Sequence, residues 1–276
     1  MEPVIKWAGG KRKLLPHIIE HLPNDLANRR FFEPFVGGGA VVFGLHPENA
    51  VINDFNRELY NLYMVIKRYP NALMRELKKP IYANTEEAFY AIRDLDRDAV
   101  AYRRMRPVQK AARTLYLNHT CYNGLFRVNS KGIFNTPFCK YSNPKILDAD
   151  NIIALSRYLR GNNIILMNGD YQRVLDMAQP GDFVYMDPPY APLTATSSFT
   201  SYIAGGWDDV EQVRLKEACD ELTARGVLWM QSNSSAPLIT ELYQDYHIYP
   251  IEARRAVGAR AESRIMVTEY IITNYD

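Results

Sequence analysis

Cysteine is scarce in this sequence of 276 residues. The three cysteines, Cys121, Cys139 and Cys219, are odd in number and far apart, and they form no C-x-x-C pair. This pattern argues against a disulfide framework and against a zinc site, and it fits a reducing compartment. We predict that the protein has no metal site.

Long apolar runs are also absent. The sequence has no stretch of about 18 apolar residues, so we expect no membrane span and no membrane partner. The first ten residues, MEPVIKWAGG, lack the apolar core of a signal peptide. The expected location is therefore cytoplasmic.

The chain has little net charge, because 33 Lys and Arg against 31 Asp and Glu give +2. A net charge this small does not by itself indicate a polyanionic partner. However, the stretch from Ala101 to Lys145 holds nine basic residues and no acid. Such a stretch is either a phosphate-binding surface or a solvated basic face, and charge alone does not separate the two. The nine residues are Arg103, Arg104, Arg106, Lys110, Arg113, Arg127, Lys131, Lys140 and Lys145.

Short apolar runs alternate with segments of helical spacing over much of the chain. Most of these runs end near a Gly, Asp or Asn, and this alternation predicts an α/β fold around a mostly parallel sheet. Two later runs, 247–251 and 268–273, flank a basic loop and predict an antiparallel edge pair. The parallel strands are expected at 31–35, 51–52, 164–167, 183–186 and 227–230.

The alternation stops between Arg57 and Leu159. This stretch has mainly helical spacing, but at 126–134 apolar residues flank a polar turn with Gly132, which indicates a β-hairpin. We therefore predict a catalytic domain of residues 1–56 and 160–276, with a smaller insertion at 57–159 that contains the basic stretch.

Three candidate ligand contacts follow predicted strands. The glycine run 37–39 follows the first strand, Asp54 the second and Asp170 the third. Ligands of open α/β sheets bind beyond the carboxyl ends of the strands, where glycines permit close backbone approach and an acid can accept ribose hydroxyls. The pattern indicates an adenosine-containing ligand, either a dinucleotide or S-adenosylmethionine, although the glycine run alone is as typical of a tight turn.

The segment Lys6-Trp7-Ala8-Gly9-Gly10-Lys11 is only superficially similar to a phosphate loop. Arg12 stands where such a loop has a Ser or Thr for magnesium, so we exclude nucleoside triphosphate hydrolysis. Lys11 beside glycines is suited to hold a carboxylate, such as that of a methionine moiety. Trp7, taken alone, indicates core packing more readily than ligand binding.

The predicted strand at 183–186 ends in Asp187-Pro188-Pro189-Tyr190. The exocyclic amine of a nucleobase is a poor nucleophile, because its lone pair is delocalised into the ring. The Asp187 carboxylate and the Pro188 carbonyl can accept its two hydrogens, while Tyr190 offers a face for stacking. Direct transfer of a methyl group held in line then needs positioning and fixed polarity, without a metal or a covalent intermediate. The Pro-Cys dipeptide of cytosine-C5 enzymes is absent.

A base must leave the duplex to reach such a turn. The loop from Ala191 to Gly206 is rich in Ser and Thr, and we predict that it closes over the flipped base with Phe199 and Tyr202 as candidate contacts. An ordinary flexible loop is the alternative.

Three motifs together resemble the Dam-type DNA adenine-N6 methyltransferases of the α class. They are Lys6 to Lys11, Glu33 to Gly39 and Asp187 to Tyr190, in this order, and the likeness also includes 53–56, 122–129, 134–138 and 191–193. This resemblance extends over essentially the whole chain. It implies a Rossmann-like methyltransferase sheet, S-adenosylmethionine as the methyl donor and double-stranded DNA as the partner.

The resemblance also implies roles for single residues. The catalytic turn is Asp187, Pro188, Pro189 and Tyr190. The cofactor-binding set is Trp7, Lys11, Glu33, Phe35, Gly37, Gly39, Asp54, Asp170 and Asp187. The DNA-recognition set is Tyr122, Asn123, Leu125, Arg127, Asn129, Pro137 and Lys140, in which Leu125, Arg127 and Pro137 match the hairpin that reads GATC, and Tyr122 matches a residue that inserts near the vacancy of the flipped adenine.

One departure from the family pattern is Cys139-Lys140-Tyr141, where many relatives have Gly-Arg-Tyr. A Lys does not replace a bidentate Arg, so one base or phosphate contact is expected to be weaker. Cytosine-N4 or RNA-adenine methylation and a catalytically silent DNA-binding protein are the alternatives. We expect no obligate protein partner, although a methylase of this kind can act beside a separate restriction nuclease.

Overall fold

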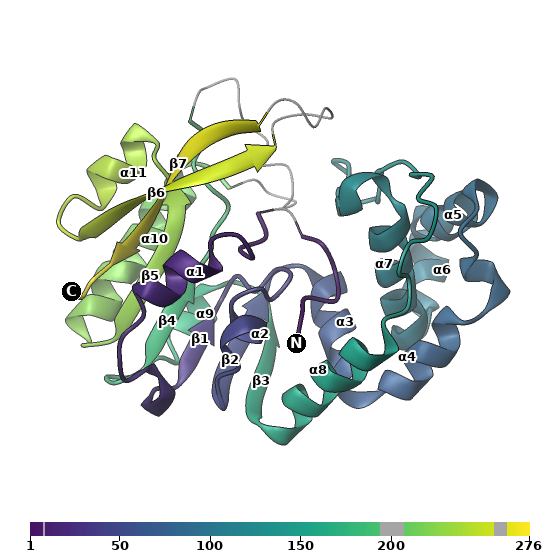
Figure 1. The fold of residues 1–276 in the computed structure, drawn as a ribbon, viewed down its shortest axis with the longest axis horizontal. Coiled ribbons are helices and arrows are strands. Elements are labelled where there is room, and N and C mark those ends of the chain that lie inside the picture. Colours follow the sequence, from purple (N-terminus) through teal and green to yellow (C-terminus); the bar gives the residue numbers. More distant parts are fainter. Residues whose placement is uncertain (8, 194–206, 257–263) are drawn as a thin grey trace.

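The computed structural model of the chain describes residues 1–7, 9–193, 207–256 and 264–276. A sheet with the strand order β3-β2-β1-β4-β5-β7-β6 forms the centre of this part (Figure 1). The five strands β3, β2, β1, β4 and β5 are parallel, and β7 runs antiparallel to both β5 and β6. The predicted α/β class and the antiparallel edge pair are thereby confirmed. The strands are β1 Phe31–Glu33, β2 Asn49–Asp54, β3 Asn163–Asn168, β4 Phe183–Met186, β5 Leu228–Ser234, β6 His247–Ala256 and β7 Arg264–Thr273.

Alternate residues of each central strand enter two different hydrophobic cores. In β4, Phe183 and Tyr185 belong to one core, and Val184 and Met186 belong to the other. Successive strand side chains point to opposite faces, so a strand covered on both faces reads as a continuous apolar run. The first core includes α3 (Arg57–Arg68), and the second includes α9 (Gln172–Leu175), α10 (Asp209–Ala224) and α11 (Pro237–Leu242).

The chain between β2 and β3 forms a helical insertion that lies to one side of the sheet (Figure 1). Its outer helices are α4 (Pro70–Leu77), α5 (Glu86–Arg93), α6 (Ala99–Arg104) and α7 (Pro107–Thr120). The first and last helices, α3 and α8 (Ala149–Gly161), both contact β3. They therefore also serve as the crossover that a parallel β2–β3 pair requires. The domain boundaries at 57 and 159 stay a prediction. Shorter helices are α1 (Leu15–Glu20), α2 (Val42–Leu45), η1 (Leu26–Asn28), η2 (Pro80–Tyr82), η3 (Asp94–Arg97) and η4 (Tyr122–Gly124).

Residues 121–141, which we call the recognition loop, follow α7. The predicted hairpin is present as a chain reversal with a single antiparallel bridge between Val128 and Phe134, rather than as two regular strands. The N–H of Asn129 donates to the Ile133 carbonyl at 2.9 Å. Gly132 has φ +75°, a value that glycine adopts without strain. The sequence therefore predicted the turn correctly, but the antiparallel pairing on either side of it is shorter than expected.

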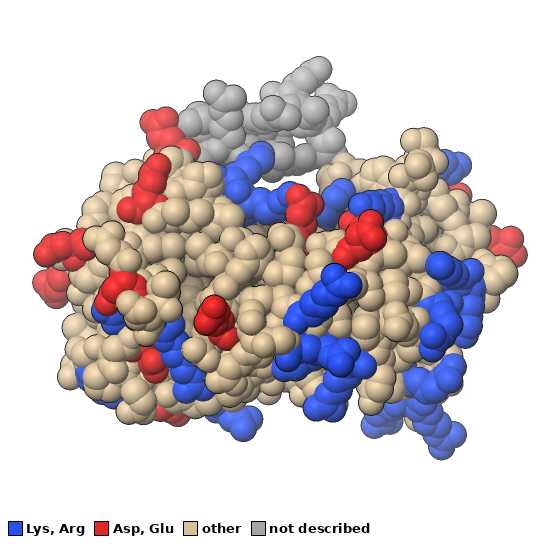
Figure 2. Space-filling model, turned by 60° about the horizontal axis from the view of Figure 1, so that its bottom comes forward, with Lys and Arg blue, Asp and Glu red and all other residues tan. Residues whose placement is uncertain are grey.

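Basic side chains gather on the half of the molecule that carries the insertion, on the face shown in Figure 2. The predicted basic surface is wrong for Arg113, which is only 1% exposed. Arg113 forms an ion pair with Asp96 inside the insertion instead. None of the described helices is both long and apolar enough to cross a membrane.

Candidate active site

The turn after β4 meets the N-terminal glycine segment through Lys11. The Lys11 Nζ lies 2.6 Å from Oδ1 of Asp187 and also donates to the carbonyl of Gly9 at 2.7 Å. The side chain of Lys11 is 6% exposed and that of Asp187 is 20% exposed. The same ammonium lies 4.6 Å from the centre of the Tyr190 ring. One buried cation thus orients both the carboxylate and the ring of the turn.

The hydroxyl of Tyr190 donates to Oε2 of Glu269 at 2.8 Å. Glu269 lies on β7 and is 6% exposed. Burial, and then the charges of Asp187 and Glu269, raise the pKa of Tyr190 well above its ordinary value, so the phenol stays protonated and acts as the donor. This contact joins the antiparallel strand β7 to the turn after β4. Glu269 has no local sequence signal and was not predicted as a site residue.

The backbone of the turn is held by neighbouring elements. The Nε2 of Gln212, on α10, donates to the carbonyl of Pro189 at 2.9 Å. On β5, the Oδ1 of Asn233 accepts the N–H of Ala191 at 3.2 Å, and the Oγ of Ser234 donates to the Ala191 carbonyl at 2.6 Å. These bonds fix the direction in which the chain leaves Tyr190, and no local sequence pattern indicates any of them.

Asp54 lies at the end of β2 and binds the glycine run. Its carboxylate accepts the N–H of Gly37 at 2.9 Å and that of Asn56 at 2.8 Å. Burial raises the pKa of Asp54 to about 6, and these two N–H groups oppose the shift. Gly37 has φ +48°, and a Cβ there would lie 2.9 Å from Cδ1 of Trp7. The structure therefore brings Trp7, Gly37 and Asp54 into one cluster, while their predicted role in cofactor binding stays a prediction.

Glu33 ends β1 beside this cluster and is 2% exposed. Its Oε2 accepts the N–H of Val42 at 3.0 Å, in the first turn of α2. Burial is the main cause that raises its pKa well above the ordinary value, and the charges of Asp187 and Asp54 add to it. Gly39, three residues before α2, has φ +73°, and a Cβ there would overlap the ring of Phe43. Both residues therefore hold the glycine run against α2.

Asp170 lies beyond β3 and is paired with Arg214 of α10. The two terminal nitrogens of Arg214 lie 3.0 and 2.9 Å from the two carboxylate oxygens. Burial opposes ionisation, but the bonds from Arg214 and from the Gln172 N–H prevail and lower the pKa of Asp170. The sequence placed Asp170 at this edge of the sheet but gave no sign of Arg214.

Three aromatic rings form a cluster next to Asp170. Phe35 lies 5.1 Å from the ring of Tyr171 and 5.4 Å from that of Trp207. The Tyr171 hydroxyl and the Trp207 Nε1 are buried and have no hydrogen-bond partner among the described residues. Because buried polar groups are normally satisfied, these two atoms are suited to a ligand with hydrogen-bonding groups.

The predicted DNA-recognition residues share the recognition loop but have different local roles. Arg127 is exposed, and its Nε donates to Oδ1 of Asn135 at 2.9 Å. Asn129 closes the turn, since its side chain accepts the N–H groups of Lys131 and Ile133. The side chain of Lys140 is 84% exposed and lies 4.0 Å from that of Glu86.

The remaining recognition residues lie near the base of the loop. Tyr122 is half-buried, and its N–H donates to the carbonyl of the exposed Pro137 at 2.9 Å. Asn123 is exposed with φ +54°, and Leu125 is half-buried.

The recognition loop and α7 contact the N-terminal segment around Lys6 and Trp7. Trp7 stacks on Phe126 with ring centres 5.2 Å apart. Asn118 of α7 binds the Lys6 backbone twice, accepting its N–H at 2.8 Å and donating to its carbonyl at 2.7 Å. It also donates to the carbonyl of Gly124 at 2.8 Å. The sequence analysis missed Asn118.

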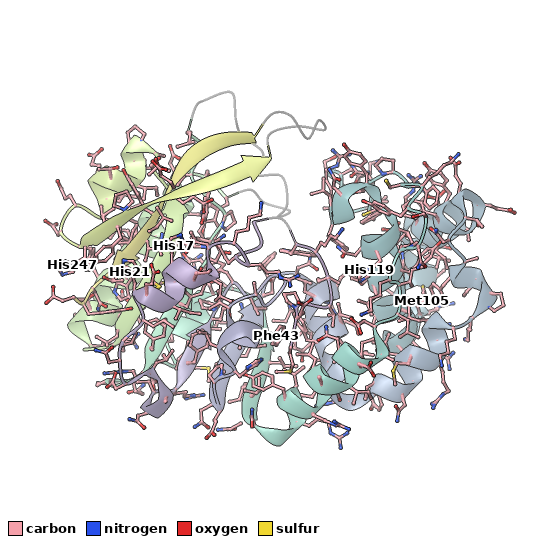
Figure 3. All side chains as sticks on the ribbon, viewed as in Figure 1. His17, His21, Phe43, Met105, His119 and His247 are labelled. Atoms are coloured by element: carbon pink, nitrogen blue, oxygen red, sulfur yellow. The ribbon has the colours of Figure 1, made fainter. Side chains whose placement is uncertain are left out.

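The described residues hold no group of three or more His, Cys, Asp or Glu side chains that could bind a metal ion. Figure 3 shows His17, His21 and His247 on the side of the C-terminal strands, and His119 on the side of the insertion. Phe199 and Tyr202, the predicted contacts of the flipped base, lie outside the described residues.

Comparison with known proteins gives a consistent result. Residues 7–257 match the model of the D12 class N6 adenine-specific DNA methyltransferases. The type II methyltransferase M1.LlaDCHI of Lactococcus lactis subsp. cremoris is 48% identical over all of this chain and 96% of its own length. The type II methyltransferase M.MjaIII of Methanocaldococcus jannaschii is 36% identical over all of this chain and 99% of its own length. The DNA adenine methylase of Escherichia coli K12 is 32% identical over 97% of this chain and 93% of its own length.

Proposed function

Since this chain belongs to the D12 class of N6 adenine-specific DNA methyltransferases, we propose that it methylates adenine N6 within GATC in double-stranded DNA, with S-adenosylmethionine as the donor. The coarser prediction, an adenine-specific DNA methyltransferase, is confirmed by the family. The site sequence GATC, the flipped base and the roles of single residues form the proposal.

The ion pair between Lys11 and Asp187 beneath the Tyr190 ring is the observation that carries the proposal. We assign Asp187 and the Pro188 carbonyl to accept the two hydrogens of the adenine amine, which moves the nitrogen towards tetrahedral geometry. Tyr190 stacks on the base. As the nitrogen–methyl bond forms and the sulfur–methyl bond breaks, the amine loses one proton to Asp187 or to water. Position and fixed polarity supply the catalysis.

The residues around the glycine run fit a bound adenosine group. S-adenosylmethionine supplies an electrophilic methyl on a sulfonium. Asp54 would accept the ribose hydroxyls, and the cluster of Phe35, Tyr171 and Trp207 would hold the adenine ring. The buried, unpartnered Tyr171 hydroxyl and Trp207 Nε1 support this assignment.

The exposed Arg127 is the assigned reader of a guanine in the site, because an Arg that binds guanine O6 and N7 is the commonest specific contact in the major groove. Two of the relatives named above are type II methyltransferases, so this enzyme would act in DNA modification beside a separate restriction nuclease.

Transfer of a labelled methyl group tests the proposal. The substrates are a GATC duplex, the same duplex with the adenine moved out of that context, and single-stranded RNA. Asp187→Ala is compared with Asp176→Ala, which removes an exposed carboxylate of α9's C-terminal end. We expect label only on the GATC duplex, lost in Asp187→Ala and retained in Asp176→Ala. Equal label on both duplexes would reject GATC, and DNA binding without any label would indicate a silent binding protein.

A further inference from the structure

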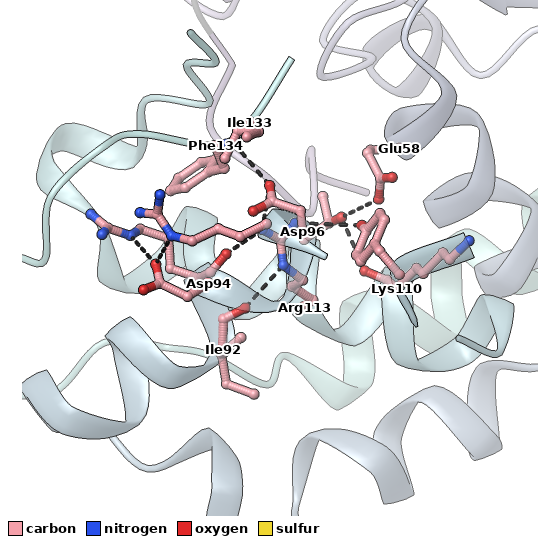
Figure 4. A network of polar contacts seen from close by, with 12 residues as sticks. Glu58, Ile92, Asp94, Asp96, Lys110, Arg113, Ile133 and Phe134 are labelled. Carbon is pink, nitrogen blue, oxygen red and sulfur yellow. Dashed lines mark hydrogen bonds and ion pairs between the residues drawn. The ribbon is translucent and has the colours of Figure 1, made fainter. Parts of the chain in front are cut away.

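A largely buried ion pair lies within the insertion, in the polar network of Figure 4. Arg113, on α7, is 1% exposed, and its Nη2 lies 2.7 Å from Oδ2 of Asp96, on η3. Arg113 also donates through Nε to the Ile92 carbonyl at 3.0 Å and through Nη2 to the Arg93 carbonyl at 2.7 Å. These bonds hold the guanidinium in one place, and the guanidinium in turn holds the Asp96 carboxylate.

The same oxygen of Asp96 reaches the recognition loop. Its Oδ2 accepts the backbone N–H of Phe134 at 2.9 Å. Phe134 is 1% exposed, and its ring lies 5.4 Å from that of Phe126. Figure 4 shows Asp96 between Arg113 and Phe134. A carboxylate that is held by a cation on one side can accept a loop N–H on the other, so the position of Phe134 depends on Arg113.

The next residue, Asn135, holds Arg127. The N–H of Asn135 donates to the Arg127 carbonyl at 3.0 Å, and its Oδ1 accepts Nε of Arg127 at 2.9 Å. Among the described residues, the two terminal nitrogens of Arg127 have no hydrogen-bond partner. The side chain is therefore braced at Nε, while its outer edge is available to a base.

We propose that Asp96 and Arg113 are positioning residues for Arg127, so that a buried ion pair sets how strictly the enzyme reads one base pair of its site. The inference rests on the proposed role of Arg127 in DNA recognition. A bidentate contact needs its donor within about 0.5 Å of the right position, and an unsupported loop does not hold a long side chain to that tolerance. Asp96 supplies the support through Phe134 and Asn135.

The test measures kcat/KM on the cognate duplex and on duplexes with each base pair of the site replaced. Arg127→Ala first identifies the base pair that Arg127 reads. We then expect Asp96→Ala to lower discrimination at that same base pair about tenfold, which is within the range of one bidentate contact. Asp96→Asn, which keeps an acceptor for Phe134 and conserves volume, should give a smaller loss and serves if Asp96→Ala folds poorly. In the Arg127→Ala background, Asp96→Ala should change discrimination no further.

Asp94→Ala is the matched control. Asp94 lies on the same short helix, but it is 44% exposed and binds Arg93 and Arg97 instead of the loop. It should leave discrimination unchanged. S-adenosylmethionine affinity should be unaffected in all Asp96 variants. If Arg127→Ala relaxes one base pair while the Asp96 variants lose activity equally on all duplexes, the ion pair only stabilises the fold and the inference is overturned. If Arg127→Ala relaxes no base pair, Arg127 is not a reader, and the inference falls together with that part of the proposed function.

Discussion

The Nζ of Lys11 and the Oδ1 of Asp187 are 2.6 Å apart, although the two residues lie in different motifs that are far apart in the sequence. Lys11 is the more deeply buried of the two. Its position next to Gly9 and Tyr190 means that one ammonium contacts both the glycine segment and the turn at 187–190. The first motif of the sequence therefore lies against the Asp187–Tyr190 turn, where we propose that methyl transfer takes place.

Lys11→Met should test this double role. The substitution keeps most of the length of the side chain but removes the cation that contacts the largely buried carboxylate of Asp187. We expect methyl transfer in single-turnover assays to fall about 100-fold, as after the loss of one preorganised polar partner in an active site. Unfolding free energy should fall by about 2–3 kcal/mol, because a buried charge loses its partner. Lys13→Met removes an exposed lysine of the same segment and should change neither quantity. Equal activity of the two variants would contradict the role of Lys11.

Much of this site was predictable because the glycine run, Asp54, Asp170 and the turn at Asp187 each lie at or after the end of a strand. The run at 183–186 is β4 to the residue, and Asp187 begins the turn directly after it. A glycine run after a strand and an acid at the end of a strand can also be recognised in the sequence. Gly37 is an example of the first and Asp54 of the second. The order of the strands then brings these segments to one edge of the sheet.

The residues that the sequence did not reveal are supports rather than motifs. Glu269, Arg214 and Asn118 each bind a predicted residue or its neighbour from a distant part of the chain. An isolated Glu on a strand or an Arg on a helix looks like a surface residue until the fold supplies its partner. For Arg113 the error is the opposite one. It was predicted to be part of a basic surface, but it is buried and forms an ion pair with Asp96 of a preceding segment.

Two substitutions of Tyr190 should separate the contribution of its ring from that of its hydroxyl. Tyr190→Phe keeps the ring and removes the bond to Glu269. We expect it to lower unfolding free energy by about 1–3 kcal/mol, the cost of removing one partner of a buried polar group, and to change kcat less than about fivefold. Tyr190→Ala also loses the stacking face, worth about 1–3 kcal/mol per base, and should lower kcat 10- to 100-fold. Denaturant unfolding and single-turnover transfer measure the two effects. Equally low kcat in both variants would show that the hydroxyl, rather than the ring, serves the reaction.

Gly39→Ala should be more damaging than the same change at Gly132. Both glycines have φ near +75°, so both substitutions carry the cost of left-handed backbone, about 1–2 kcal/mol. A Cβ at Gly39 would also lie 2.1 Å from the Phe43 ring, whereas a Cβ at Gly132 meets nothing within 4 Å. The clash should add about 1–3 kcal/mol at Gly39. Thermal unfolding of the two variants gives the difference directly, and equal destabilisation would mean that α2 shifts to accommodate the methyl group.

The pKa of Asp54 predicts how cofactor affinity depends on pH. Burial raises this pKa to about 6, above the ordinary value of 3.8, in the protein without ligand. If the ionised carboxylate accepts the ribose hydroxyls, binding must expel the proton that Asp54 takes up as pH falls through about 6. Affinity should therefore be constant above about pH 7, and Kd should rise up to tenfold per pH unit below 6.

Calorimetric titration of S-adenosylmethionine between about pH 5 and 8 measures this dependence, within the range where a carboxyl of raised pKa titrates. Asp54→Asn is the control, because its amide accepts hydrogen bonds but does not titrate. It should bind more weakly at high pH, where the wild type is ionised, and the part of the pH dependence below 6 that belongs to Asp54 should disappear. A wild-type Kd that stays constant down to pH 5, or the same rise in Asp54→Asn, would show that the carboxylate does not contact the ligand. Asp54 would then only hold Gly37 and Asn56 in place, as it already does without ligand.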